Sequence, residues 1–189
     1  MSSGIVRWGG WAGVVAALTY VLAGILILIA PLQRVFSSFG QHLIEVILVV
    51  AFAATLVVIV GLHGSQRGRY GRSGAAGSLI AFIGYALIAL VATISVLVGG
   101  EDLSAVRLMA ALAVLVGSVI LGAMTLRARA LPWWCGVLLV IGFPLGDVLE
   151  EVVARGSEGI VFGIVWGLVG YALLSSSSRA PERRSVRVS

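Results

Sequence analysis

The chain has 189 residues, of which 60% are hydrophobic and 11% are charged, and its formal net charge is +5. Its mean hydropathy is +1.11. Soluble domains carry about 25% charged residues, so this composition excludes a water-soluble globular protein and indicates an integral membrane protein. Because one membrane crossing takes about 20 residues, the chain has room for six spans with short loops and for no soluble domain.

The residue types that are absent exclude several functional classes. All 13 basic residues are arginine, so no lysine amine is available for a retinal or pyridoxal Schiff base. Cys135 is the only cysteine, which excludes an internal disulfide and a Cys-x-x-Cys redox pair. The phosphate-binding, dinucleotide-binding, zinc-hydrolase and serine-hydrolase motifs are also missing from the sequence. We therefore expect a protein that is not an enzyme and that carries no cofactor or metal.

Six apolar stretches separated by polar segments predict an all-α integral membrane bundle of six transmembrane helices. They cover residues 11–30, 43–62, 75–98, 103–126, 131–149 and 159–174. The first four are long and nearly uncharged, as a helix that satisfies its own backbone in hydrocarbon requires. The fifth is interrupted by Gly142, Pro144 and Gly146. We expect residues 1–174 to form a single transmembrane domain and residues 175–189 to form a basic, flexible cytoplasmic tail.

The distribution of charge predicts the orientation of the bundle. One side holds ten arginines and one acid, and the other holds three arginines and seven acids, which gives formal charges of +9 and −4. Arginine-rich loops stay in the cytoplasm, so both termini should be cytoplasmic in a multi-pass protein of the cytoplasmic membrane. The arginine-rich face should attract anionic lipid headgroups. Nucleic-acid binding is not expected, because the basic residues lie in short loops and a tail.

A weak internal repeat marks the starts of the first, third and fifth spans. Gly13, Gly77 and Gly136 follow similar segments and are separated by 64 and 59 residues. This spacing suggests three helical hairpins in the same orientation. Glycine-rich membrane sequences also align with themselves by chance, so a true triplication remains one of two explanations.

Short motifs beside two loops carry a family resemblance. They are Leu62-His63, Gln66-Arg67 and Tyr70-Gly71 after the second span, and Leu131-Pro132 with Trp134 at the fifth. These motifs resemble those of a loose group of small bacterial polytopic membrane proteins of uncharacterised activity. The resemblance implies a multi-pass bacterial membrane protein and transfers no activity, cofactor or site residue to this chain.

The sixth span carries a stripe of small residues. Gly159, Gly163 and Gly167 recur at every fourth position, so their missing side chains leave one helix face open to close approach by another helix. The partner helix could belong to the same chain, to a second protomer or to another membrane protein. A homo-oligomer therefore remains an open alternative.

Polar residues gather near the ends of the spans on the acidic side. The candidate residues for an outer polar or ion site are His42, Glu45, Arg107, Asp147, Glu150 and Glu151. His42 and Glu45 share a helix face at a spacing of three residues, and Arg107 lies about 6 Å inside the fourth span. Ionisable groups within membranes often mark ion pathways, and Pro144 frees a helix carbonyl that could serve as a ligand. The alternative is that these charges form ordinary ion pairs at the water boundary.

Two functions follow from these patterns. The first is a structural, assembly or regulatory protein that works through helix association. The second is a small transporter or channel-like protein that uses the outward-facing polar site. The middle of every span is apolar apart from hydroxyl groups, which weighs against an ion channel.

Overall fold

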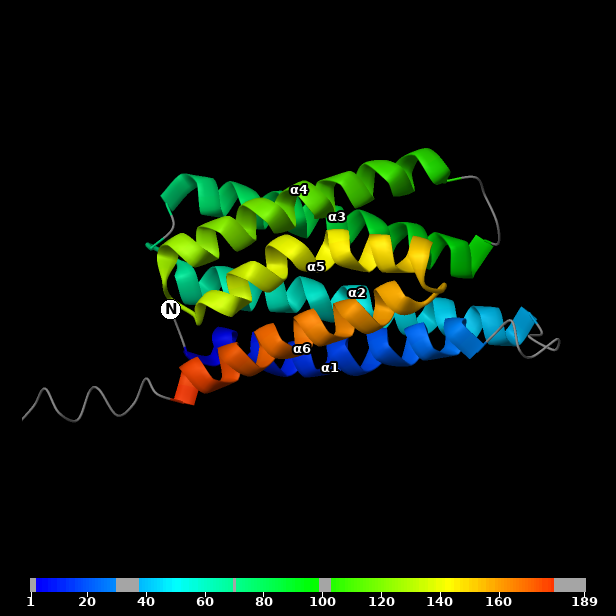
Figure 1. Cartoon of the computed structure of the whole chain (residues 1–189), viewed down its shortest axis with the longest axis horizontal. Coiled ribbons are helices and arrows are strands. Elements are labelled where there is room, and N and C mark those ends of the chain that lie inside the picture. Colours follow the sequence, from blue (N-terminus) through cyan, green and yellow to red (C-terminus); the bar gives the residue numbers. More distant parts are fainter. Residues whose placement is uncertain (1–2, 30–37, 70, 99–102, 179–189) are drawn as a thin grey trace, which may run out of the picture.

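The protein folds as an all-α bundle, as predicted. The computed structural model describes residues 3–29, 38–69, 71–98 and 103–178. Within these residues it contains six helices, which run side by side along the long axis of the molecule (Figure 1). They are α1 (Ser3–Ile29), α2 (Ser38–Gln66), α3 (Gly71–Val98), α4 (Ser104–Ala128), α5 (Trp133–Val152) and α6 (Ser157–Ser178).

Five of the six helices are long and apolar enough to cross a membrane. They are α1, α2, α3, α4 and α6. The fifth helix, α5, is not among them, and its C-terminal part carries Asp147, Glu150 and Glu151. Trp8, Trp11 and Trp133 are each more than half exposed near one end of the bundle, as expected for aromatic side chains at a membrane interface. The structure thus supports a multi-pass membrane protein with five candidate spans.

The helices extend beyond the apolar stretches that predicted them. The first helix begins at Ser3 instead of Trp11, and the last ends at Ser178 instead of Leu174. In this last turn the hydroxyls of Ser176 and Ser177 donate to backbone carbonyl groups three residues earlier, both at 2.8 Å. A helix continues into the interfacial region because its hydrogen bonds do not depend on hydropathy. Hydropathy alone therefore marks only the part of the helix that lies in hydrocarbon.

The helices form a closed ring in chain order. Each packs against the next, and α6 returns to pack against α1, so that the first and last helices lie side by side (Figure 1). Consecutive helices run in opposite directions. This arrangement is compatible with three hairpins, and the proposed triplication stays a prediction. Closing the ring encloses a space between the six helices.

The glycine stripe of α6 lies against α1 of the same chain. A Cβ atom on Gly163 would lie 2.5 Å from Val21 Cγ2 and 2.8 Å from the Ala17 carbonyl oxygen, and one on Gly167 would lie 2.9 Å from Ala17 Cβ. A Cβ atom on Gly159 would approach the α1 backbone within 2.9 Å. Real Cβ atoms are not found this close, so the contact requires glycine. Of the partners that the sequence left open, the structure places a helix of the same chain on this stripe.

The charged residues separate the bundle into two ends. At what we call the arginine end lie the start of α1, the end of α2, the start of α3 and the end of α4, with Arg7, Arg67, Arg69, Arg72, Arg127 and Arg129 among the described residues. The opposite end, with Glu45, Asp147, Glu150, Glu151 and Glu158, is the acidic end. The structure contains no membrane, so which end faces the cytoplasm rests on the charge rule alone.

The arginine end of the bundle is tightly packed. Gln66 is fully buried, and its Nε2 donates to Thr125 Oγ1 at 2.9 Å, which joins α2 to α4. Thr125 Oγ1 in turn donates to the Leu121 carbonyl at 2.7 Å. Leu62 and Leu173 are also fully buried. A buried amide is tolerated here because it has a hydrogen-bonding partner.

Candidate ligand-binding cavity

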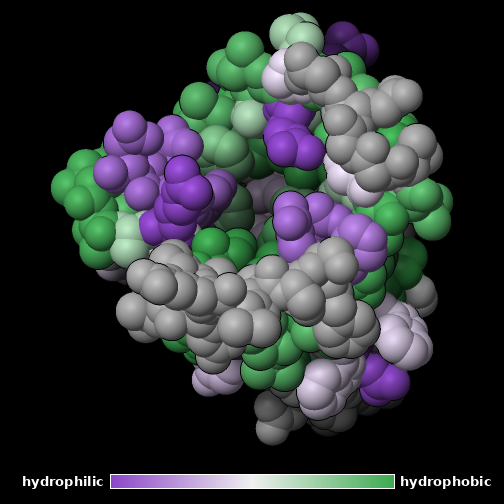
Figure 2. Space-filling view, turned by 90° about the vertical axis from the view of Figure 1, so that its right-hand side faces the viewer, coloured by the Kyte–Doolittle hydropathy of each residue, from purple (hydrophilic) through white to green (hydrophobic). Residues whose placement is uncertain are grey.

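The ring of helices encloses a cavity toward the acidic end. Its volume is about 540 Å³, and every one of the six helices contributes to its lining. Figure 2 views this end and shows hydrophilic side chains around a hollow, with apolar groups beside them. Small-molecule sites typically measure about 300 to 1,000 Å³ and are mostly apolar with a few polar groups. The cavity has the size and character of such a site.

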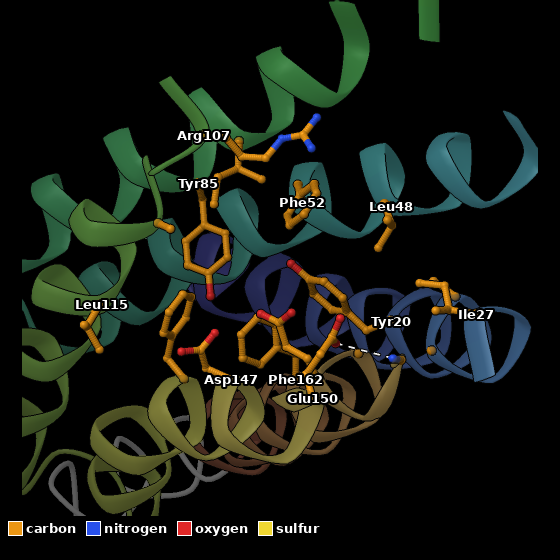
Figure 3. Close-up of a pocket in the computed structure, with 18 of the residues that line it drawn as sticks. Tyr20, Ile27, Leu48, Phe52, Tyr85, Arg107, Leu115, Asp147, Glu150 and Phe162 are labelled. Atoms are coloured by element: carbon orange, nitrogen blue, oxygen red, sulfur yellow. Dashed lines mark hydrogen bonds between the residues drawn. The ribbon is translucent and has the colours of Figure 1, made fainter. Parts of the chain in front are cut away.

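Four charged side chains line the cavity. Asp147 and Glu150 come from α5, Glu158 from the first turn of α6, and Arg107 from α4. In the close-up the two α5 carboxylates lie across the cavity from Arg107, whose guanidinium group is directed away from them (Figure 3). Among the described residues, no ion pair joins Arg107 to Asp147 or Glu150, and the nearby ion pair that the structure shows joins His42 to Glu45. Asp147 is therefore not paired with Arg107, as the ion-pair interpretation of the sequence would require.

Two of these charged groups are held by hydrogen bonds within the protein. Glu150 Oε2 accepts from the backbone N–H of Gly156 at 3.4 Å, marked by the dashed line in Figure 3. Gly156 has a φ of 93°, a conformation that glycine adopts without the strain of a side chain. On the opposite wall, Arg107 donates to Ser95 Oγ on α3 at 3.5 Å. Glu150 thus also shapes the turn between α5 and α6, while Arg107 is held toward α3.

Aromatic side chains form the inner wall of the cavity. One comes from each of five helices, and they are Tyr20, Phe52, Tyr85, Phe143 and Phe162. The rings contact one another: Tyr20 meets Phe52 and Phe162 edge-on at centroid distances of 5.7 and 5.8 Å, and Phe143 stacks on Phe162 at 5.3 Å. Such contacts stabilise a fixed arrangement of rings. The cavity therefore has a preformed aromatic wall below its charged groups.

The aromatic wall separates the cavity from the packed arginine end. Trp166, which is 2% exposed, meets Tyr85 edge-on at 5.6 Å. Further toward the arginine end, Val169 and Leu173 on α6 are fully buried. Trp166, Val169 and Leu173 do not line the cavity. The cavity is thus a blind pocket that extends from the acidic end into the bundle, and among the described residues it does not continue as a pore.

The structure brings together only part of the predicted outer site. Arg107, Asp147 and Glu150 line the cavity, whereas His42, Glu45 and Glu151 do not. Glu45 lies one turn nearer the start of α2 than Leu48, the first α2 residue of the lining. His42 Nδ1 is 3.8 Å from Glu45 Oε2, and the His42 side chain is 60% exposed. These two residues form a separate pair, because they lie in the part of α2 that precedes Leu48 and does not reach the cavity.

The predicted outer polar or ion site stays a prediction, and the described residues limit what kind of site it could be. Among them, no three His, Cys, Asp or Glu side chains are arranged to hold a metal ion. The helix α5 is also continuous through Pro144. It therefore lacks the unwound segment whose backbone carbonyls bind ions in some transporters. The chemistry of the cavity lies instead in its carboxylates and aromatic rings.

The sequence pattern missed two parts of the cavity. Glu158 was counted among the acids of the outer side but not among the candidate site residues, because it precedes the sixth apolar stretch. The aromatic wall was missed because single rings in separate spans form no local motif. The sequence did contain one signal: five of the six predicted apolar stretches each contain one of these aromatic residues. When the helices close into a ring, aromatic side chains at similar heights along the bundle axis meet in its interior.

Searches against known protein families, curated proteins and solved structures found no match to this chain. No family is therefore identified, and the resemblance seen in the loop motifs stays a prediction. The functional argument rests on the cavity itself.

Proposed function

We propose that the protein binds a small, mainly apolar molecule in the cavity at its acidic end, as the recognition step of a transporter-like membrane protein. The observation that carries this proposal is the cavity of about 540 Å³ that all six helices enclose. By the positive-inside rule, the acidic end faces outward across the cytoplasmic membrane. The molecule would then enter from outside the cell, and the role is one of binding rather than catalysis.

Of the two functions that the sequence left open, the structure favours the second. Helix association with a partner was inferred from the glycine stripe, and that stripe packs against α1 of the same chain. The stripe therefore no longer requires a second protomer or another protein. A channel is also disfavoured, because the pocket ends at the aromatic wall and the arginine end is packed. A carrier binds its substrate in such a blind site before a change of conformation.

A binding experiment with a cavity-filling variant tests the proposal. The purified full chain in non-ionic detergent is dialysed against three aromatic probes: neutral triphenylphosphine oxide, tetraphenylphosphonium and tetraphenylborate. Ala111 lines the cavity, whereas Val116 is 49% exposed and lies outside the lining. We expect saturable binding of at least one probe, lost in Ala111→Trp and kept in Val116→Trp. The proposal fails if no probe binds saturably, or if Ala111→Trp binds as the wild type does.

A further inference from the structure

We infer that the cavity selects a lipophilic organic cation, a molecule with aromatic or aliphatic bulk and a single positive charge. This inference rests on the proposed function and names the class of its ligand. The charged lining consists of three carboxylates and one guanidinium group, which gives a formal charge of −2. A negative cavity attracts a cation and repels an anion of the same shape.

No positively charged side chain is paired with any of the three carboxylates among the described residues. Asp147 and Glu158 make no hydrogen bond or ion pair among the described residues, and Glu150 accepts only the 3.4 Å bond from Gly156. Glu158 lines the same cavity as Glu150 and Asp147, so like charges face one another there. Glu150 also lies in the last turn of α5, where the helix dipole disfavours a negative charge. A bound cation would relieve both unfavourable interactions.

The guanidinium group of Arg107 does not neutralise these carboxylates. It lies on the opposite wall, donates toward Ser95 Oγ at 3.5 Å, and is directed away from Asp147 and Glu150 (Figure 3). It is exposed at the surface of the bundle and is not enclosed among the carboxylates. Space for the positive group of a ligand therefore remains beside the carboxylates.

The remaining lining favours an organic cation over an inorganic one. Aromatic faces attract cations, most strongly where water is excluded, and the rings of Tyr20, Tyr85 and Phe162 extend into the cavity near the carboxylates (Figure 3). Aliphatic side chains, Leu112 and Leu115 among them, cover much of the rest. This surface would contribute nothing to a hydrated metal ion, but it would bury the apolar part of a lipophilic one.

The chain offers a matched set of variants for the test. Asp147→Asn and Glu158→Gln each remove one carboxylate from the lining. Glu151→Gln removes an equal charge from the same part of α5, but Glu151 is exposed and lies outside the cavity. Any effect of net charge alone would appear equally in all three. Each variant is first checked for the elution volume and melting temperature of the folded protein.

The measurement compares two ions of the same shape and opposite charge by equilibrium dialysis of the full chain. We expect tetraphenylphosphonium to bind at least about tenfold more tightly than tetraphenylborate, a difference of about 1.4 kcal/mol. Asp147→Asn and Glu158→Gln should each weaken tetraphenylphosphonium about tenfold, and Glu151→Gln should change it less than about twofold.

Two outcomes would overturn the inference in distinguishable ways. If tetraphenylphosphonium and neutral triphenylphosphine oxide bind with equal affinity and Asp147→Asn changes neither, the cavity binds apolar molecules without selecting a charge. The inference then fails while the proposed function stands. If no probe binds saturably, or Ala111→Trp leaves binding unchanged, both fail.

Discussion

At the scale of single residues, the carboxylates of the cavity carry the argument. Asp147 was predictable as a candidate because it ends an apolar stretch, but its surroundings were not. The sequence left two alternatives: Asp147 could join His42 and Glu45 in an ion site, or it could form an ordinary ion pair at the water boundary. The structure places it in the cavity with Glu150 and Glu158 and without a paired cation among the described residues. Its environment depends on which helices the ring brings together, which no local pattern reveals.

This environment predicts that removing the charge of Asp147 does not destabilise the empty protein. Asp147→Asn relieves like-charge repulsion with the other two carboxylates of the cavity, Glu150 and Glu158, so we expect stability to rise by about 0.2 to 0.5 kcal/mol. Thermal unfolding in detergent at low salt measures the effect, which should shrink as salt screens the charges. Glu151→Gln removes an exposed charge from the last turn of α5, outside the cavity, and is the control for a carboxylate that does not line the cavity. A lower melting temperature for Asp147→Asn would reveal a stabilising cation partner.

At the scale of the helices, the hydrophobic composition of the sequence predicted the elements better than it predicted the site. The six apolar stretches each correspond to a helix. Their ends were misplaced, because α1 begins at Ser3, before the first stretch, and α6 continues into a serine segment whose hydroxyls donate to backbone carbonyls. The glycine spacing of α6 indicated close packing, but only the ring order of the helices identifies α1 as its partner.

The α1–α6 contact predicts a clear effect of adding a side chain to the stripe. Gly163→Leu would drive atoms into Val21 and the Ala17 carbonyl, and overpacking of this kind typically costs about 1 to 3 kcal/mol. Gly167→Ala meets only the Ala17 methyl group, so it should cost less. Melting temperatures in detergent test this order. Equal stability of Gly163→Leu and the wild type would show that the stripe does not pack against α1.

At the scale of the whole molecule, the membrane class followed from composition alone, while the cavity required the structure. Hydropathy and charge identify a multi-pass protein with an arginine-rich side and an acidic side. They do not reveal that the helices close into a ring with space at one end and tight packing at the other. In the sequence, Phe52 and Phe143 are ordinary apolar residues of separate spans. They form part of the aromatic wall only because α6 packs against α1 and closes the ring.

The orientation of the bundle predicts which positions an impermeant reagent can reach. In a Cys135→Ala background, a cysteine at Ser104, which opens α4 at the acidic end, should react with an impermeant maleimide in intact cells. Cysteines at Ser65, near the end of α2, and at Ser185 in the tail should react only after the membrane is permeabilised. Labelling at Ser65 but not at Ser104 in intact cells would reverse the orientation and place the cavity on the cytoplasmic side.

The most direct test of the central claim, a cavity that binds a lipophilic cation, is to locate such an ion in a crystal structure. Tetraphenylarsonium has the shape and charge of tetraphenylphosphonium, and its arsenic atom is found by anomalous scattering. We predict a single arsenic peak inside the cavity, between the carboxylates of Asp147 and Glu158 and the ring of Phe162, and its loss in Ala111→Trp crystals. Arsenic peaks confined to the lipid-facing surface, with none in the cavity of the wild type, would contradict the account.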